Sequence, residues 1–341
     1  MKFGVGYYSL QSHPHRPRPH EELYEEMLNE ISVADGMGFN SAWLTEHHFL
    51  SDGYCPSLLI AAAAIAARTK NIRIGTGVLL MPLHDPIRIA EDAAVVDLIS
   101  RGRLILGIGL GYRKEEFEGY GRSLKERKGR MEESIEILQK SWSDETFSFN
   151  GKYYILKDVN VTPKPVQRPI PIWIGAFTEP AIRRAARIGA PPYVPAIGTI
   201  PIIKNLFDLH SSLLQEYERD SEDYEKPLVR EFYISDKKKE KVWDDIKEYI
   251  TYTAKGYAQW GSMVDYSGNL IADPTDPIIY DIVKDQSIIG TPEECVETIS
   301  EYKESLPIDN LICRFKFPGI SHQEAMRSMK LFVDKVLPYV S

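Results

Sequence analysis

The sequence predicts an α/β fold in which parallel strands alternate with helices. Short β-branched runs alternate with amphipathic helical stretches along the chain, a pattern that favours parallel strands joined by crossover helices. The 341 residues accommodate the strand–helix units of a (β/α)8 barrel of the TIM type, which is commonly one domain at this length. We expect a single domain over residues 1–341, with one hairpin excursion and a long lid loop before the last strand.

The first half of the chain contains four of the expected strands. They are rich in β-branched and aromatic residues and span 3–8, 41–45, 72–81 and 103–109. A helix over 20–38 is predicted by Leu23, Met27, Ile31 and Ala34 at helical spacing. Further helices are expected at 57–68, which is alanine-rich, and at 86–100, followed by a charged, partly helical segment to about 143.

The second half begins with a hairpin excursion at about 146–160, because Asn150-Gly151 is a strong turn signal between aromatic runs. The remaining strands are expected at 171–174, 192–196, 228–234 and 310–315. Helices are expected at 178–188, 239–260, 292–305 and 322–340, and a further helix after the sixth strand ends at about residue 220. Residues 261–290 lack a regular pattern, which is typical of a functional lid or of a disordered segment.

Composition argues against several classes of partner. The net charge of −8 comes from 41 basic and 49 acidic residues spread along the chain. The sequence contains no stripe of basic residues, which argues against nucleic acid as a partner. No apolar run reaches the roughly 18 residues needed to span a bilayer, and residues 1–8 read as a strand and not as a signal peptide. An odd number of cysteines without metal spacing, 3 in all, favours a reducing, cytoplasmic location.

The most informative motif is Glu46-His47-His48-Phe49, directly after the second predicted strand. Adjacent side chains of a strand point to opposite faces, so one histidine can enter a pocket while the other packs against a helix. A neighbouring glutamate can fix the tautomer and orientation of a histidine. The alternative is a partly buried pair that only caps the strand.

Other candidate residues follow from the rule that barrel active sites lie at the carboxyl ends of the strands. Glycines lie at positions 75, 77, 107, 109, 111 and 175. They would let the backbone approach a flat or phosphorylated ligand, although tight turns explain them equally well. Thr178 could cap a helix whose free N–H groups suit a phosphate. A Rossmann fingerprint is disfavoured because Tyr112 stands where its last Gly or Ala belongs.

His13-Pro-His15 is a candidate metal site. Such a pair after the first strand would suit a metal-dependent hydrolase barrel, but the fifth and sixth strands supply no further histidine. We therefore expect no metal.

Several segments together resemble the bacterial luciferase-like monooxygenases. They are residues 1–4, the run from Gly38 to Phe49, Gly102-Arg103, Gly290 to Cys295 and the terminal Ser328 to Pro338. The resemblance implies a barrel that binds reduced FMN supplied by a separate reductase. It also implies that a flavin hydroperoxide, formed with O2, oxidises a small apolar organic substrate.

The resemblance assigns roles residue by residue. His47, with Glu46 beside it, matches the catalytic histidine, and Thr76, Gly77 and Val78 match the strand against the flavin ring, with a cis peptide at Gly77–Val78. The other cofactor contacts would be Gly109, Leu110, Gly111, Tyr112, Ala176, Phe177 and Thr178. The expected substrate pocket contains Tyr7, Tyr8 and Phe49.

Three positions depart from true luciferase, which has a reactive cysteine at the place of Gly109, a phosphate-binding arginine at that of Leu110 and a glutamate at that of Phe177. We therefore expect no light emission and a different phosphate partner, with Arg113, Arg183 or Arg184 as candidates. The resemblance further implies a homodimer through helices 57–68 and 86–100. The alternatives are a deazaflavin-dependent hydride-transfer enzyme on the same barrel, a non-catalytic flavin-binding protein and a metal-dependent hydrolase.

Overall fold

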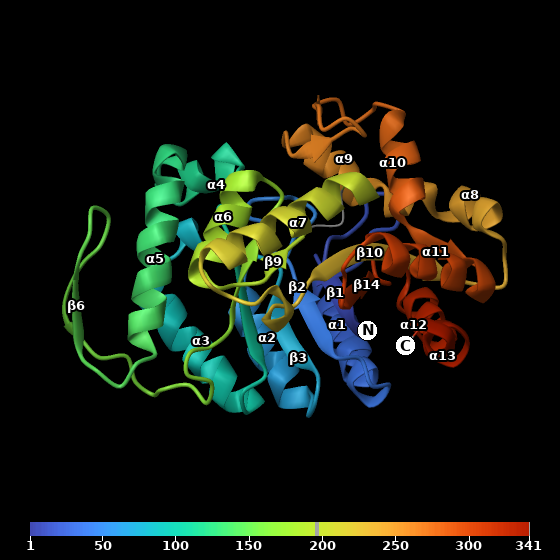
Figure 1. Ribbon diagram of the computed structural model, residues 1–341. Coiled ribbons are helices and arrows are strands. Elements are labelled where there is room, and N and C mark those ends of the chain that lie inside the picture. Colours follow the sequence, from blue (N-terminus) through green and yellow to red (C-terminus); the bar gives the residue numbers. More distant parts are fainter. Residues whose placement is uncertain (195–197, 341) are drawn as a thin grey trace.

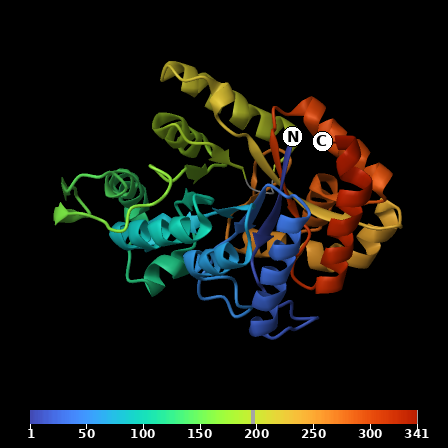
Figure 2. The same cartoon turned by 90° about the horizontal axis from the view of Figure 1, so that it is seen from below.

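A curved parallel β-sheet surrounded by helices dominates the computed structural model, which describes residues 1–194 and 198–340 (Figures 1 and 2). Its main path runs β13 (Ile288–Gly290), β10 (Pro227–Ile234), β14 (Asn310–Arg314), β1 (Lys2–Tyr8), β2 (Ser41–Leu44), β3 (Arg73–Thr76), β5 (Leu104–Gly109), β8 (Ile172–Gly175) and β9 (Pro192–Tyr193). The short β4 (Leu79–Leu80) pairs with β5. These strands form a half-barrel, so the prediction of a parallel α/β fold is confirmed.

The pairing between β1 and β2 is irregular near Gly6. Their register shifts between Gly6 and Tyr8, and Gly6 has a φ of 144°. A Cβ atom at Gly6 would lie 2.5 Å from the backbone nitrogen of Trp43, so only glycine permits this close approach. At the other end of the path, an isolated parallel bridge joins Val194 to Leu228.

The outer face of the sheet is covered by helices (Figure 2). The longer ones are α1 (His20–Gly36), α2 (Leu58–Arg68), α3 (Pro86–Ser100), α5 (Arg127–Ser141), α6 (Glu179–Ile188), α7 (Ile200–Glu216), α8 (Lys239–Ile250), α11 (Pro292–Ser305) and α12 (His322–Leu331). The shorter ones are α4 (Lys114–Gly119), α9 (Tyr252–Gln259), α10 (Ile278–Gln286) and α13 (Leu337–Val340). None of the helices in the described ranges is long and apolar enough to cross a membrane.

The concave side of the sheet is filled by large side chains. Trp43 packs against Trp173 and Tyr193 with ring centroids 4.8 and 4.9 Å apart, and Ile105, Val229 and Ile312 complete this buried cluster. The interior is therefore a packed core, and space for a ligand remains at the carboxyl ends of the strands.

The predicted hairpin is confirmed by the antiparallel pair β6 (Phe147–Asn150) and β7 (Ile155–Val159), which projects from the body beyond α5 (Figure 1). Three predicted elements are divided. The helix expected at 322–340 becomes α12 and α13, separated by a π-helical stretch over Phe332–Val336. The strand expected at 72–81 becomes β3 and β4, separated by the cis peptide Gly77–Val78. The helix expected at 239–260 becomes α8 and α9, which meet at Thr251, where the hydroxyl group donates to the Lys247 carbonyl.

Residues 261–290 were expected to be one irregular loop, and this was wrong. The segment contains the antiparallel pair β11 (Met263–Val264) and β12 (Leu270–Ile271), then α10 and β13. Helix α10 forms because Ile279, Ile282 and Val283, at helical spacing, bury one face among the apolar residues of α8. The strand expected at 192–196 is observed as β9 with Val194 in a bridge, and residues 195–196 lie outside the described residues.

Candidate active site

A cavity of about 450 Å³ opens at the carboxyl ends of the sheet strands, a volume typical of small-molecule sites. Further walls come from α9 and from the β11–β12 segment. The expected site residues that line it are Tyr7, Glu46, His47, Gly77, Val78, Gly109, Leu110, Gly111, Tyr112, Ala176, Phe177 and Thr178. Segments far apart in the chain thus meet at one place.

Three of the expected residues lie elsewhere. Thr76 is fully buried, and its hydroxyl group donates to the Gly107 carbonyl at 2.7 Å. Tyr8 belongs to the core between sheet and helices, because β1 turns its side chain to the face opposite Tyr7. Phe49 is 61% exposed and packs on Tyr120 outside the cavity. Tyr8 and Phe49 therefore do not line the cavity, in contrast to the prediction for the substrate pocket.

His47 is held by a residue that the sequence analysis missed. Its Nδ1 lies 2.8 Å from Oε1 of Glu116, a fully buried residue of α4, and not against Glu46. The same oxygen accepts the His48 N–H at 2.9 Å and an Arg113 N–H at 3.1 Å. In the sequence, Glu116 is one of several glutamates in the charged stretch after β5. Its burial is not visible there, so the sequence does not distinguish it from its exposed neighbours.

The charge on Glu116 determines how His47 is oriented. Burial would raise the pKa of Glu116, but the hydrogen bond from His47, the His48 N–H and Arg113 hold that pKa below its usual value. An ionised carboxylate only accepts hydrogen bonds, so Nδ1 of His47 donates. Its Nε2 is thereby left for the cavity side, 3.4 Å from the Tyr112 hydroxyl group. The imidazole is then placed to accept or return a proton at Nε2.

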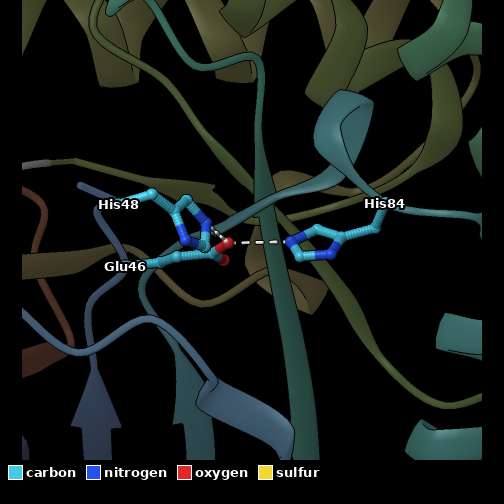
Figure 3. A group of neighbouring side chains, drawn as sticks. All are labelled: Glu46, His48 and His84. Atoms are coloured by element: carbon cyan, nitrogen blue, oxygen red, sulfur yellow. Dashed lines mark hydrogen bonds and ion pairs between the residues drawn. The ribbon is translucent and has the colours of Figure 1, made fainter. Parts of the chain in front are cut away.

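Glu46 has a different set of partners (Figure 3). Its Oε1 lies 2.5 Å from His48 Nε2 and 2.7 Å from His84 Nε2, and its Oε2 accepts the Leu80 N–H at 2.9 Å. Burial would raise the pKa of Glu46, but the bonds from His48 and His84 lower it to about 2. Glu46 is therefore a carboxylate, and both imidazoles donate to it.

The floor of the cavity is made of tyrosines, most of which the sequence analysis missed. The Tyr257 hydroxyl group lies 2.5 Å from that of Tyr7 and 3.4 Å from that of Tyr54, which contacts Thr45 at 2.5 Å. The Tyr193 hydroxyl group is buried without a partner among the described residues. Burial raises the pKa of these four phenols, so all are neutral at physiological pH.

The three arginines expected near a phosphate are all paired with carboxylates. Arg113 bonds to Glu116, Arg183 to Glu179 and Arg184 to Glu132. No lysine or arginine is among the described residues that line the cavity. Thr178, at the N-terminus of α6, makes no side-chain capping bond and lines the cavity, so its hydroxyl group remains available there.

The walls around the cis peptide suit a flat, apolar ring. A Cβ atom at Gly109 would lie 2.5 Å from the Val78 side chain, so the two strand ends pack together only because glycine is present. Gly109 is thus required for packing against Val78, whether or not it also contacts a ligand. The resulting wall of Val78, Leu80 and Gly109 carries few polar groups, which fits a flavin ring better than a charged ligand.

Among the described residues, His13 and His15 do not belong to a group of side chains spaced closely enough to hold an ion. His13 is buried, with its ring 4.7 Å from that of Tyr252, and its Nδ1 accepts the His15 N–H at 3.2 Å. Within the described residues, the group of side chains spaced closely enough to hold an ion is Glu46, His48 and His84.

Comparisons with known proteins give a consistent result. The model of a family described as luciferase-like monooxygenase matches residues 1–308. The alkanal monooxygenase alpha chain of the Kryptophanaron alfredi symbiont is 27% identical over 351 residues, covering 94% of each chain. The oxygenase component of the flavin-dependent trigonelline monooxygenase of Acinetobacter baylyi is 25% identical, covering 94% of this chain and 91% of the relative.

Solved structures share the fold. A monooxygenase of Streptomyces bottropensis superimposes with a TM-score of 0.86 at 23% identity, covering 100% of both chains. The oxygenating constituent of 3,6-diketocamphane monooxygenase from Pseudomonas putida, in complex with FMN, gives 0.82 at 20% identity, covering 100% and 99%. An F420-dependent secondary alcohol dehydrogenase gives 0.75 at 18% identity, covering 100% of both chains. At these identities the likeness concerns the fold alone.

Proposed function

The chain belongs to the luciferase-like monooxygenase family, and on this premise we propose that it is a flavin-dependent monooxygenase. It uses reduced FMN and O2 to oxidise a small apolar organic substrate, without light emission. The observation that carries the proposal is the position of His47, fixed by buried Glu116 and facing an apolar cavity at the strand ends. The relatives named as flavin-dependent oxygenases support the same reaction class.

The oxygen chemistry belongs to the flavin when it is bound. The residues of this chain contribute placement. The segment Gly77 to Leu80 and the turn Gly109 to Tyr112, which line the cavity, would orient the ring, and the tyrosine floor would exclude water from the reacting region. His47 holds or moves a proton at Nε2, because Nδ1 is engaged by Glu116.

The phosphate of FMN is assigned to the start of α6. The uncapped Thr178 hydroxyl group and the Glu179 N–H would hold it, since Pro180 lacks an N–H and the Ala181 N–H donates to the Thr178 carbonyl. Arg113, Arg183 and Arg184 are less suitable than expected, because each is already paired with a carboxylate.

The proposal is tested by titrating the protein anaerobically with reduced FMN and with a reduced 8-hydroxy-5-deazaflavin coenzyme, then admitting O2. Preferential FMN binding followed by rapid flavin oxidation, with an oxygenated product when substrate is present, supports it. Preference for the deazaflavin with no oxygen reaction would overturn it in favour of hydride transfer. Binding of FMN without any oxygen chemistry would instead indicate a flavin-binding protein.

The family relationship and the structure also support finer proposals. A separate reductase would supply reduced FMN, since the relative from Acinetobacter is named as an oxygenase component.

The three cysteines are buried and unbridged, in keeping with a cytoplasmic location. The bridge between Val194 and Leu228 is compatible with closure as an eight-stranded barrel, and the segment over 261–290 would act as its lid.

A homodimer through α2 and α3 is supported by an apolar surface on these helices. Ile60 is 75% exposed, and Val95, Leu98 and Ile99 are 43%, 38% and 44% exposed, whereas Ala62 faces the core. We expect Ile60→Glu to give monomers in sedimentation experiments. Ile155→Glu, on the equally exposed hairpin strand β7, is the matched control and should remain dimeric. Dimers of the Ile60 variant would contradict this surface.

A further inference from the structure

Glu46, His48 and His84 form a hydrogen-bonded cluster (Figure 3), and Glu46 lines the cavity. The cluster is not accounted for by the role proposed for His47, because no bond joins Glu46 to His47 among the described contacts. We propose that Glu46 is a positioning residue that fixes the flavin-facing segment Gly77 to Leu80 through the Leu80 N–H. This inference rests on the proposed function, since it assigns a ring of the cofactor to that segment.

Both carboxylate oxygens of Glu46 are engaged. Oε1 accepts from two imidazoles and Oε2 accepts the Leu80 N–H at 2.9 Å. The Glu46 side chain is 1% exposed, so water does not compete for these bonds. A carboxylate with three charge-assisted hydrogen bonds is held in one orientation, and it is not poised to exchange protons with a substrate.

Besides the bond to Glu46, the segment Gly77 to Leu80 is anchored at its start, where the Gly77 N–H donates to the carbonyl of Leu44, the last residue of β2, at 2.6 Å. β4 comprises only Leu79 and Leu80, which pair with Ile108 and Gly109 of β5. Gly77 and Val78, directly before it, lie outside the regular strands and line the cavity. The Leu80 N–H bond to Glu46 therefore ties this short segment to the end of β2, across the wall that faces the ligand.

The two histidines in turn fix Glu46. His48 comes from the same segment and bonds at Nδ1 to the Tyr120 hydroxyl group at 3.2 Å. His84 precedes Asp85, whose side chain caps α3 by accepting from the Ile87 and Arg88 N–H groups. The carboxylate thus joins the end of β2, the β4 segment and the start of α3.

A metal ion is the alternative occupant of the cluster, and the distances disfavour it. Two ligands of one tetrahedral zinc ion, each about 2.0–2.2 Å from the metal, lie about 3.3 Å apart. The oxygen–nitrogen distances here are 2.5 and 2.7 Å, which are hydrogen-bond distances. The cluster is complete without an ion, because each imidazole donates to the carboxylate.

The test compares the FMN affinity of the wild-type protein with that of Glu46→Gln, His84→Gln and the double variant, by quenching of flavin fluorescence. His15→Gln, an exposed histidine of the loop after β1, is the matched control. We expect Glu46→Gln to raise the Kd for FMN roughly tenfold to hundredfold, as lost charge-assisted hydrogen bonds do. His84→Gln should raise it less, and the double variant should be no weaker than Glu46→Gln alone, because both act through one contact.

A second readout separates positioning from proton transfer. The pH dependence of turnover should keep its shape in Glu46→Gln while the Kd changes. Unchanged FMN affinity together with loss of one limb of the pH profile would overturn the proposal. Weaker FMN binding of wild-type protein after treatment with a chelator, restored by Zn²⁺, would overturn it in favour of a metal site.

Two further controls keep the test decisive. If Glu46→Gln fails to fold, the FMN affinity of His84→Gln alone tests the proposal. The His84 side chain is 22% exposed, so its replacement should disturb folding less than replacement of the buried Glu46. If wild-type protein binds only the deazaflavin, the proposed monooxygenase function fails. The same variants are then compared with that coenzyme, and equal affinities would overturn the positioning role.

Discussion

The side of the cavity that carries Glu46 and His47, called the polar wall below, and the floor of the cavity are built from different chemistry. Two buried carboxylates, Glu46 and Glu116, orient His48, His84 and His47 at the polar wall through charge-assisted hydrogen bonds. The floor contains neutral phenols linked to one another. Bonds to charged groups contribute more than neutral ones, about 1.5–3 against 0.5–1.5 kcal/mol. Substitutions in the polar wall should therefore disturb the reaction, whereas those in the floor should be tolerated.

Replacement of His47 tests the polar wall at the point of largest effect. His47→Ala should lower substrate turnover by about 10²–10⁴-fold, the usual contribution of a general acid or base. FMN affinity should change little, because the apolar residues Val78, Leu80 and Gly109, and not His47, are proposed to contact the flavin ring. Turnover is measured as substrate-dependent oxygen consumption, and FMN binding by fluorescence. Unchanged turnover would remove His47 from its proposed role.

His210 on α7 sharpens the comparison, because it is a buried histidine without a carboxylate. Its Nε2 lies 3.0 Å from the Ala190 carbonyl, and burial lowers its pKa to about 4. The unfolded chain, with a histidine pKa near 6.5, takes up the proton first as the pH falls. The contribution of His210 to the free energy of unfolding is therefore fully present above about pH 6.5. It is lost as the pH falls towards 4, by about 3 kcal/mol in total.

The measurement is the free energy of unfolding in denaturant at pH 7.5 and at pH 4.5. Wild-type protein should lose about 2–3 kcal/mol more than His210→Gln over this interval, since glutamine donates the same bond but does not titrate. Parallel losses in the two proteins would show that His210 is not the acid-sensitive group.

Glu116→Gln tests whether the carboxylate sets the orientation of His47. We expect turnover to fall roughly tenfold to hundredfold, because a neutral amide holds the imidazole less firmly than a charged partner does. Glu115→Gln is the matched control, since the neighbouring Glu115 side chain is 68% exposed. Equal turnover of the two variants would mean that the bond between His47 and Glu116 is not needed for the reaction.

Tyr7→Phe is the smallest expected change and tests the floor. It removes the hydroxyl group bonded to Tyr257 but keeps the aromatic ring in the core. We expect a loss of about 1 kcal/mol in the free energy of unfolding and turnover within a few-fold of wild type. A loss of turnover as large as that of Glu116→Gln would remove the distinction between the polar wall and the floor.

The parts of this molecule that were predictable depend on nearby residues. Helical spacing and the Asn150-Gly151 turn predicted the main elements and the hairpin. The motif Glu46-His47-His48 predicted that one histidine enters the cavity and the other turns away. The same local view led to an error for 261–290, because its glycines, aspartates and prolines obscured the buried face of α10.

The partners of the site residues could not be predicted in this way. Glu46 is adjacent to His47 in sequence but bonds to His84 and Leu80, while His47 bonds to Glu116, 69 positions away. Tyr257 and Tyr193 reach the floor from distant elements. Periodicity and turn chemistry act between neighbours in the chain, so they specify elements and the direction of side chains. Which carboxylate meets which imidazole depends on how the strand ends and the helices pack, and only the folded chain brings those groups together.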